Sequence, residues 1–283
     1  MKKILLAGYG KLAKDYAAEL LATNESIKLD VVSKSSKPSD CSKISHIQCD
    51  LSVSEQVNQL NSDYDIAIII LAPSARTDEA YRQVYYQSTS NLLNRLDNIC
   101  RIIFVSSTRV YSQSHGEIVD EKTPVRANDV QTKAIIDSEN LILKNNRGYV
   151  IRFSGIYGKG RRSTFDSVTQ QKSSRFSPDY VSNRIHQTDC VGILTFVTTN
   201  IISGKKLPSI ILASDSLPEK ISVISSWLSE KLQLPNISFN NQSQSLGKRC
   251  DNSLLISLGY QLKYPNYQAG FTSEIEKYSS DSN

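Results

Sequence analysis

A glycine-rich turn between an apolar run and a helical pattern stands near the start of the chain. The apolar run is Ile4–Ala7, and the turn reads Gly8-Tyr9-Gly10-Lys11-Leu12-Ala13. In a turn of this kind the first glycine permits the sharp change of direction, the second lets the backbone approach a pyrophosphate, and small Ala13 lets the helix pack close to the strand. This context predicts a dinucleotide-binding loop, although any tight turn between a strand and a helix can use glycines.

Short apolar runs alternate with helical patterns over the first 156 residues. The predicted strands are Ile4–Ala7, Lys28–Val32, His46–Cys49, Ile66–Leu71, Ile102–Ser106 and Tyr149–Phe153. The predicted helices are Leu12–Ala22, Asp78–Leu96 and Gln131–Leu143. Such alternation predicts an α/β fold with a doubly wound parallel sheet of the Rossmann type. The run 66–71 is apolar throughout, which is typical of a central strand covered on both faces.

The character of the sequence changes near residue 157. Lys159–Ser174 is rich in Arg, Gly, Ser and Gln, and the later apolar runs are isolated. In this part we expect helices at Thr188–Ile202 and Pro218–Leu232, a strand at Ser209–Ala213, and Trp227 in a core. The expected division is a Rossmann domain over residues 1–156 and a small, mainly C-terminal substrate lobe over residues 157–283, with residues from about 188 to 213 returning to the Rossmann core.

Composition argues against several kinds of protein. No segment approaches the roughly 18 apolar residues that cross a bilayer, and the apolar run before Gly8 is too short for a signal peptide, so we expect a cytoplasmic protein. The five cysteines form an odd set without Cys-x-x-Cys spacing, which argues against disulfides and structural zinc. The three histidines are scattered, and no metal site is predicted. The net charge of +5 is spread along the chain without an aromatic-basic motif, so no nucleic-acid partner is expected.

Six segments follow one another over nearly the whole chain and carry the most specific signal. They are Gly8–Ala13, Cys49–Leu51, Leu71–Pro73, Phe104–Tyr111, Arg152–Arg161 and Arg184–Asp189. In this order they resemble the extended and atypical branches of the short-chain dehydrogenase/reductase superfamily, the group that contains nucleotide-sugar epimerases, dehydratases and reductases. Gly247–Asn252 and Leu258–Tyr260 resemble the atypical branch described as sugar-nucleotide epimerase-like.

The resemblance implies an NAD(P)-dependent oxidoreductase or epimerase that acts on a sugar nucleotide or a similar carbonyl or alcohol compound. The expected partner is a small molecule, with phosphorylated and nucleotide-linked compounds as candidates, and the expected assembly is a monomer or a homodimer. The alternative is a dinucleotide-binding protein that has lost its chemistry and senses redox state or acts as a scaffold.

The resemblance also implies where the cofactor lies. Ligands of open parallel sheets bind outside the carboxyl ends of the strands, where several of the motifs fall. By resemblance, Asp50 and Leu51 flank the adenine, and residues 153–156 pass near the nicotinamide. The full set of expected cofactor-binding residues is Gly8, Tyr9, Gly10, Lys11, Leu12, Ser33, Lys34, Asp50, Leu51, Leu71, Ala72, Pro73, Ser106, Lys133, Phe153, Ser154, Gly155 and Ile156.

Ser33 and Lys34 follow the second predicted strand, where dehydrogenases that prefer NAD place an acidic residue. A cation and hydroxyls suit a 2′-phosphate, so the pair predicts NADP, with NAD as the other candidate. The rival interpretation of Lys34 is a solvated loop charge. Asp30 is at about the right distance after Gly8 to be the acidic residue, but it lies inside the predicted strand.

The superfamily's Tyr-x-x-x-Lys pair is altered here. Lys133 holds the place of the lysine, but Asp129 stands where the tyrosine is expected. Ser107 holds the place of the residue that hydrogen-bonds the reacting oxygen. We therefore expect Ser107 and Lys133 in the catalytic site, Tyr111 as a second candidate for the acid, and Asp129 as a charge or cap at the start of a helix.

The last two motifs supply the candidates for binding the substrate. Arg161, Arg184 and His186 lie in them, and guanidinium groups suit a phosphate or a carboxylate. Each arginine can equally be a solvated surface charge. For His186 a structural role is favoured over a catalytic one, since Thr188 or Asp189 next to it can cap the following helix. Thr108 and Arg109 hold the places of the acidic pair of sugar dehydratases, which disfavours dehydratase chemistry.

Overall fold

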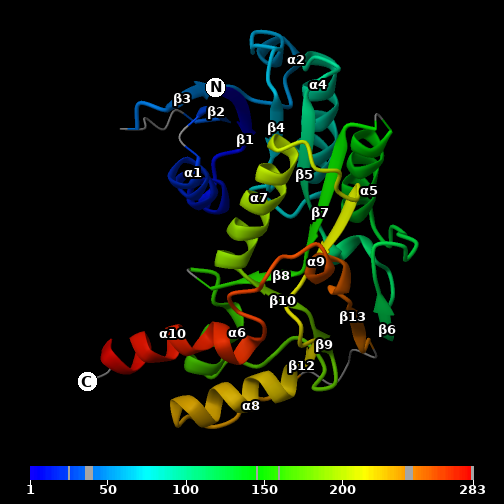
Figure 1. The fold of residues 1–283 in the computed structure, drawn as a ribbon. Helices are drawn as coiled ribbons and strands as arrows, with labels where there is room; N and C mark the ends of the chain where they lie inside the picture. Colours follow the sequence, from blue (N-terminus) through cyan, green and yellow to red (C-terminus); the bar gives the residue numbers. More distant parts are fainter. Residues whose placement is uncertain (25, 36–40, 145, 159, 240–244, 282–283) are drawn as a thin grey trace. The chain divides into compact units, whose positions relative to one another are not determined.

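The computed structural model describes residues 1–24, 26–35, 41–144, 146–158, 160–239 and 245–281 (Figure 1). The chain forms two compact units. Unit 1 comprises Met1–Val110, Val125–Arg152 and Val191–Ile211. Unit 2 comprises Tyr111–Pro124, Phe153–Cys190 and Leu212–Asn283. Tyr111–Pro124 thus leaves the first 156 residues, which we expected to form one domain, and joins unit 2.

Unit 1 contains the parallel sheet and the helices next to it in sequence. Its strands are β1 (Lys2–Ala7), β2 (Ile27–Ser33), β3 (Ile44–Gln48), β4 (Ile66–Ile69), β5 (Arg101–Ser107), β7 (Gly148–Phe153) and β11 (Ile210–Ala213), the last two continuing into unit 2. Its helices are α1 (Lys11–Thr23), α2 (Ser54–Val57), α3 (Asp78–Tyr81), the π-helical η1 (Arg82–Gln87), α4 (Ser88–Arg95), the 3₁₀ turn η2 (Thr108–Val110), α5 (Val130–Leu143) and most of α7 (Gln187–Ile202).

The sheet has the order β11-β7-β5-β4-β1-β2-β3. Chain order reverses at β1, because β2 and β3 lie on one side of it and β4 and β5 on the other. The pairings of β1 with β2 and β4, of β2 with β3, and of β4 with β5 are parallel. This arrangement confirms the predicted Rossmann-type α/β fold and places the ligand-binding edge at the carboxyl ends of the strands.

Complete burial explains the apolar strands of unit 1. All four residues of β4 are buried, as are Ile4–Ala7 of β1. Phe104 of β5 and Leu92 of α4 are completely buried and belong to the same core cluster. The predicted central strand is confirmed, although it ends at Ile69 and leaves Leu71 to pack on the edge of the cluster.

Unit 2 is built of short strands and helices around a second core. Its remaining elements are β6 (His115–Val119), β8 (Gly155–Tyr157), α6 (Ser163–Thr169), β9 (Val181–Ser182), β10 (Arg184–His186), β12 (Glu219–Lys220), α8 (Ile221–Leu232), β13 (Gly247–Cys250), α9 (Ser253–Ser257) and α10 (Tyr267–Asp281). The strands form a four-stranded sheet, β12-β9-β13-β6, and the parallel pair of β8 and β10. The second core gathers Phe165, Leu228 and Phe271, with Trp227 packed against it as expected.

One expectation about secondary structure needs correction, and one helix was not predicted. The segment 78–96, expected as one helix, runs as α3, η1 and α4 in succession, so its middle turn is π-helical. The polar stretch 159–174, for which no element was predicted, contains α6, whose Phe165 and Val168 are completely buried. Two apolar residues three positions apart were too few to stand out among its polar neighbours.

In the described part of the chain, no helix has the length and apolar character needed to cross a membrane.

Candidate functional site

The glycine turn adopts the conformation that the sequence predicts. Gly8 has φ of +95°, and its amide donates to the carbonyl of Val32 on β2 at 2.9 Å. A Cβ at Gly8 would lie 2.2 Å from the carbonyl oxygen of Ile70, so only glycine fits the passage from β1 to α1. The following residues begin the helix, where Leu12 and Ala13 are buried.

The start of α1 has the properties of an anion site. Gly10 is its N-cap, and a Cβ there would meet no atom of the described chain within 4 Å. Among the described residues no side chain caps this helix end, and its first turn holds no acidic residue. The amides of a helix N-terminus and the helix dipole both favour a negative group. These features fit a cofactor pyrophosphate approaching the backbone at Gly10.

Polar residues gather where β2 and β3 end. The ammonium of Lys34 lies 3.0 Å from the carboxylate of Asp50, and the hydroxyl of Ser33 lies 3.0 Å from Nε2 of His46. Burial acts to raise the pKa of Asp50, but hydrogen bonds from Ser52 and the contact with Lys34 outweigh it and lower the pKa. The expected ribose-binding residues thus meet at one strand edge, and His46 joins them although the sequence marked it only as a strand residue.

Asp30 does not reach this group. Its carboxylate accepts a hydrogen bond from the hydroxyl of Tyr64 at 2.8 Å, and it lies within β2 rather than at its end. The alternative acidic ligand for an adenosine ribose is therefore engaged elsewhere in unit 1.

The expected adenine-side residues follow β3 and β4. Leu51 is buried, and its carbonyl accepts a hydrogen bond from the amide of Asn91 on α4 at 2.9 Å. Ala72 is exposed and Pro73 half-buried, just beyond the end of β4. Both segments thus continue from carboxyl ends of parallel strands, where open α/β sheets bind ligands.

Ser106 turns its side chain into the protein. Its hydroxyl donates to Glu139 of α5 at 2.5 Å, and Glu139 also pairs with Arg152 of β7, whose Nη2 lies 2.6 Å from the carboxylate. The side chains of Glu139 and Arg152 are only 2% and 3% exposed. Any contact of Ser106 with a cofactor would therefore involve its backbone, while the buried network fixes α5 against β5 and β7.

The side chain of Ser107 lies next to Arg109 in the 3₁₀ turn that follows β5. Its oxygen accepts the backbone N–H of Arg109 at 3.2 Å, which leaves the hydroxyl hydrogen for another acceptor. The guanidinium of Arg109 donates to Thr132 at 3.0 Å and to Asp129 at 2.8 Å, and lies over the ring of Tyr81 at 5.5 Å. A fixed positive charge is therefore held two residues from Ser107.

Asp129 is the N-cap of α5. Its carboxylate accepts the amide of Thr132 at 2.6 Å in addition to the hydrogen bond from Arg109. Burial acts to raise the pKa of Asp129, but these hydrogen bonds outweigh it and hold the pKa below its ordinary value. The residue in the place of the family's tyrosine is thus ionised near neutral pH, and its geometry is that of a cap.

Lys133 lies one turn into α5 with an exposed side chain. Its ammonium contacts Asp137 of the same helix at 2.6 Å. An exposed pair of this spacing contributes only about 0.3–0.5 kcal/mol, so it leaves the lysine able to turn to another anion or hydroxyl.

Tyr111 is the second candidate for the acid and belongs to unit 2. It is buried, and its hydroxyl donates to the carbonyl of Asp120 at 2.7 Å. This bond uses the phenolic proton within the loop Tyr111–Pro124, which favours a structural role.

The nicotinamide candidates follow β7 in the same unit: Phe153 and Ser154 are buried, Ile156 is half-buried, and Gly155 donates its amide to the carbonyl of Asn183 at 3.1 Å.

The two arginine candidates differ in environment. Arg161 is exposed, whereas Arg184 is 8% exposed and donates to Thr164 at 2.9 Å. Asp215 is buried near Arg184, and burial raises its pKa to about 8. Within the described residues, Nε of Arg184 and Oδ2 of Asp215 have no hydrogen-bond partner. Arg184 is therefore an internal charge of unit 2 rather than a solvated surface charge.

His186 is buried and caps α7. Its Nδ1 accepts the amide of Thr188 at 3.2 Å, and its ring lies 4.0 Å from that of Tyr264. Burial, and then the charge of Lys263, lower its pKa to about 4. The carboxylate of Asp189 instead accepts the amides of Lys263 and Tyr264. His186 is thus neutral at pH 7, and it, rather than Thr188 or Asp189, satisfies the start of the helix.

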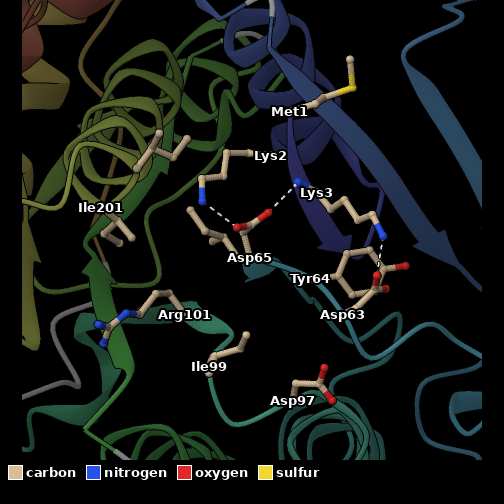
Figure 2. A pocket seen from close by; sticks show the side chains of 12 residues that line it. Met1, Lys2, Lys3, Asp63, Tyr64, Asp65, Asp97, Ile99, Arg101 and Ile201 are labelled. Atoms are coloured by element: carbon tan, nitrogen blue, oxygen red, sulfur yellow. Dashed lines mark hydrogen bonds and ion pairs between the residues drawn. The ribbon is translucent and has the colours of Figure 1, made fainter.

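A pocket of about 460 Å³ opens at the other edge of the sheet, where β1, β4 and β5 begin (Figure 2). The ammonium of Lys2 lies 2.6 Å from Asp65, and that of Lys3 pairs with Asp63. None of the predicted site residues lines it.

Within the described residues, no group of three or more His, Cys, Asp or Glu side chains could hold a metal ion.

The structure is similar to several solved structures of epimerases and dehydratases. A proposed NAD-dependent epimerase/dehydratase from Methylobacillus flagellatus superposes with a TM-score of 0.81 at 24% identity, over 98% of this chain and 99% of that one. dTDP-glucose 4,6-dehydratase from Bacillus anthracis, in complex with NAD, superposes with a TM-score of 0.81 at 12% identity. The superposition covers 99% of this chain and 97% of that one. A mutant of UDP-glucuronic acid 4-epimerase from Bacillus cereus, in complex with a fluorinated UDP-sugar and NAD, superposes with a TM-score of 0.79 at 17% identity. The superposition covers 98% of this chain and 99% of that one.

These identities establish a shared fold and no more. No curated protein matches the chain significantly. Residues 5–207, most of the chain, match the model of the 3-beta hydroxysteroid dehydrogenase/isomerase family. The chain therefore belongs to this family of extended short-chain dehydrogenases/reductases.

Proposed function

We propose that the protein is an NADP-dependent oxidoreductase or epimerase that acts on a sugar nucleotide or a similar carbonyl compound. The observation that carries the proposal is the glycine turn, which brings the uncapped start of α1 to the carboxyl edge of the sheet at its topological switch point. Family membership supports an enzyme, and two of the solved neighbours named above, the dTDP-glucose dehydratase and the UDP-glucuronic acid epimerase, contain NAD and act on nucleotide sugars.

The preference for NADP rests on Ser33 and Lys34 at the end of β2. These residues offer a hydroxyl and a cation where an acidic side chain would repel a 2′-phosphate. Asp30, the alternative ribose ligand, is engaged by Tyr64. A human epimerase family protein of the same fold contains NADPH, so the fold accommodates the phosphorylated cofactor.

The proposed chemistry needs a hydride carrier, and the nicotinamide supplies this when bound. Ser107 would donate its hydroxyl hydrogen to the substrate oxygen, because in the described part of the chain its oxygen accepts the amide of Arg109 and its hydrogen remains for another acceptor. Lys133 would hold the ribose hydroxyls once it turns from Asp137. Asp129 would not deliver a proton, since it is an ionised cap, and the guanidinium of Arg109 would stabilise negative charge on the substrate oxygen without giving a proton.

The experiment is a turnover screen of the whole chain. Each of NAD⁺ and NADP⁺ is combined with UDP-glucose, UDP-glucuronic acid and dTDP-glucose, and the products are followed by absorbance of the reduced nicotinamide and by chromatography. We expect one combination to react, and we expect Ser107→Ala to abolish that reaction while keeping cofactor affinity. Tight cofactor binding without turnover of any of these or of a wider carbonyl panel would support the alternative, a non-catalytic dinucleotide-binding protein.

A further inference from the structure

The pocket where β1, β4 and β5 begin carries the most exposed apolar side chains of the described chain (Figure 2). Met1 is 88% exposed and Ile99 is 84% exposed, the highest values among the large hydrophobic side chains that the structure describes. Ile201 and Ile202, at the end of α7, line the same pocket and are half-buried. Apolar side chains that gather in water around a hollow mark a surface that another molecule covers.

Two side chains of opposite charge at this pocket are left over for such a molecule. The two lysines of β1 are paired with aspartates, as described above. Within the described residues, the carboxylate of Asp97 and the guanidinium of Arg101 have neither an ion pair nor a hydrogen bond, and both side chains are exposed. A small anion at Arg101 would also meet Asp97, and a small cation at Asp97 would also meet Arg101. A partner that offers both signs of charge satisfies the two together.

The order of these residues along the chain matches what a two-fold axis requires. Asp97, Ile99 and Arg101 stand at every second position between the end of α4 and the start of β5, and Figure 2 shows the side chain of Ile99 between the other two. In a contact of two-fold symmetry the same surface meets itself, so each pairing occurs twice. A second copy laid antiparallel along this segment places Ile99 against the partner's Ile99 and each Arg101 against the partner's Asp97.

We propose that this surface, made of Met1, Asp97, Ile99, Arg101, Ile201 and Ile202, joins two copies of the chain about a two-fold axis at Ile99. The apolar side chains supply the affinity, since exposed ion pairs add little to it and mainly select the partner and its register. Met1 has a flexible side chain that fits irregular hollows, so it fills the partner's pocket. The inference is independent of the proposed function, because the surface contains none of the predicted site residues.

The test is sedimentation equilibrium of the full chain over a wide range of protein concentrations. The chain is prepared without an N-terminal tag, because Met1 lies in the surface. The variants are Arg101→Asp, Asp97→Arg and the double variant that carries both changes. Lys231→Asp is the matched control, because it reverses the charge of an exposed lysine in the last turn of α8, in unit 2. Circular dichroism reports whether each variant folds.

We expect the wild-type chain and Lys231→Asp to form dimers of equal affinity. Each single reversal should weaken the dimer by about tenfold, because the two-fold axis turns one substitution into two contacts between like charges. The double variant restores both opposite-charge contacts and should dimerise like the wild-type chain. A monomeric wild-type chain, a dimer that neither reversal weakens, or a folded double variant as weak as the single ones would overturn the inference.

Discussion

The guanidinium of Arg109 lies 2.8 Å from the carboxylate of Asp129. By resemblance, these two positions hold proton-transfer groups in relatives: an acid of the dehydratase pair at the first and a tyrosine at the second. Here they form an ion pair that also binds Thr132 and flanks the ring of Tyr81. An ion pair can stabilise charge on a substrate, but neither of its members is suited to give up a proton at neutral pH.

The first prediction separates the two members of this pair. Asp129→Asn keeps an acceptor for the cap and removes the ion pair, so turnover of any substrate found in the screen should fall less than about tenfold. Arg109→Gln removes the positive charge next to Ser107, and kcat/KM should fall by about a hundredfold, the size of one lost charge-stabilising donor.

Steady-state kinetics with cofactor affinities measured alongside would check both effects. If Asp129→Asn alone lost about a hundredfold in kcat, the aspartate would be the general acid and its assignment as a cap incomplete. Equal losses in the two variants, with equal losses of stability, would make the pair purely structural.

The second prediction concerns the buried network of Glu139, Arg152 and Ser106. Glu139→Gln leaves the guanidinium of Arg152 buried without a counter-ion, which costs about 3–5 kcal/mol of unfolding free energy. Asp137→Asn, two residues earlier on α5, is the matched control because its pair with Lys133 is exposed and contributes about 0–1 kcal/mol. Urea denaturation of the three chains gives these values, and equal stabilities would contradict the importance of the network.

The third prediction is a pH dependence of stability from Asp215. Its pKa is about 8 in the folded chain against an ordinary 3.8, so the folded state holds the proton more tightly. The protonated carboxyl therefore contributes to the free energy of unfolding. This contribution is fully present below pH 3.8 and is lost as the pH rises toward about 8, at up to about 1.4 kcal/mol per pH unit. Asp215→Asn cannot ionise and should lack this loss.

Thermal unfolding of both chains between about pH 4 and pH 9 gives the measurement. The variant should gain stability over the wild-type chain as the pH rises. Asp179→Asn, which changes an exposed carboxylate paired with Lys220, should follow the wild-type curve. Parallel curves for Asp215→Asn and the wild-type chain would show that the carboxyl is ionised in the folded state.

The sequence predicted the elements of unit 1 because their signals are local. The apolar run at 66–71, the glycine turn and the helical spacing of 131–143 each specify their structure within a few residues. In unit 2 the strands are two to five residues long, and pairs such as β9 with β13 join segments that are far apart in sequence. Strands this short carry no readable alternation, so the small sheets could not be predicted.

The site was predictable only where the local backbone geometry requires a particular residue type. Gly8 and the cap at Asp129 follow from backbone geometry that few residues satisfy. The partners of Ser106 and Ser33 come from other elements: Glu139 lies 33 residues from Ser106, and His46 lies 13 residues from Ser33. A serine before a turn gives no sign of which way it points. Burial of Arg184 was equally hidden, because arginine is more often exposed.

Calorimetric titration of the wild-type chain, Gly10→Ala and Gly10→Val with NADP⁺ and NAD⁺ tests directly whether the glycine turn binds a dinucleotide. A Cβ at Gly10 meets no described atom within 4 Å, so both variants should fold, and each added methyl group should fill space meant for the pyrophosphate. We expect binding to the wild-type chain, weaker binding to Gly10→Ala, and a loss of about tenfold to a hundredfold in Gly10→Val, as when charge-assisted phosphate contacts are lost. A folded Gly10→Val chain with wild-type affinity for both cofactors would contradict it.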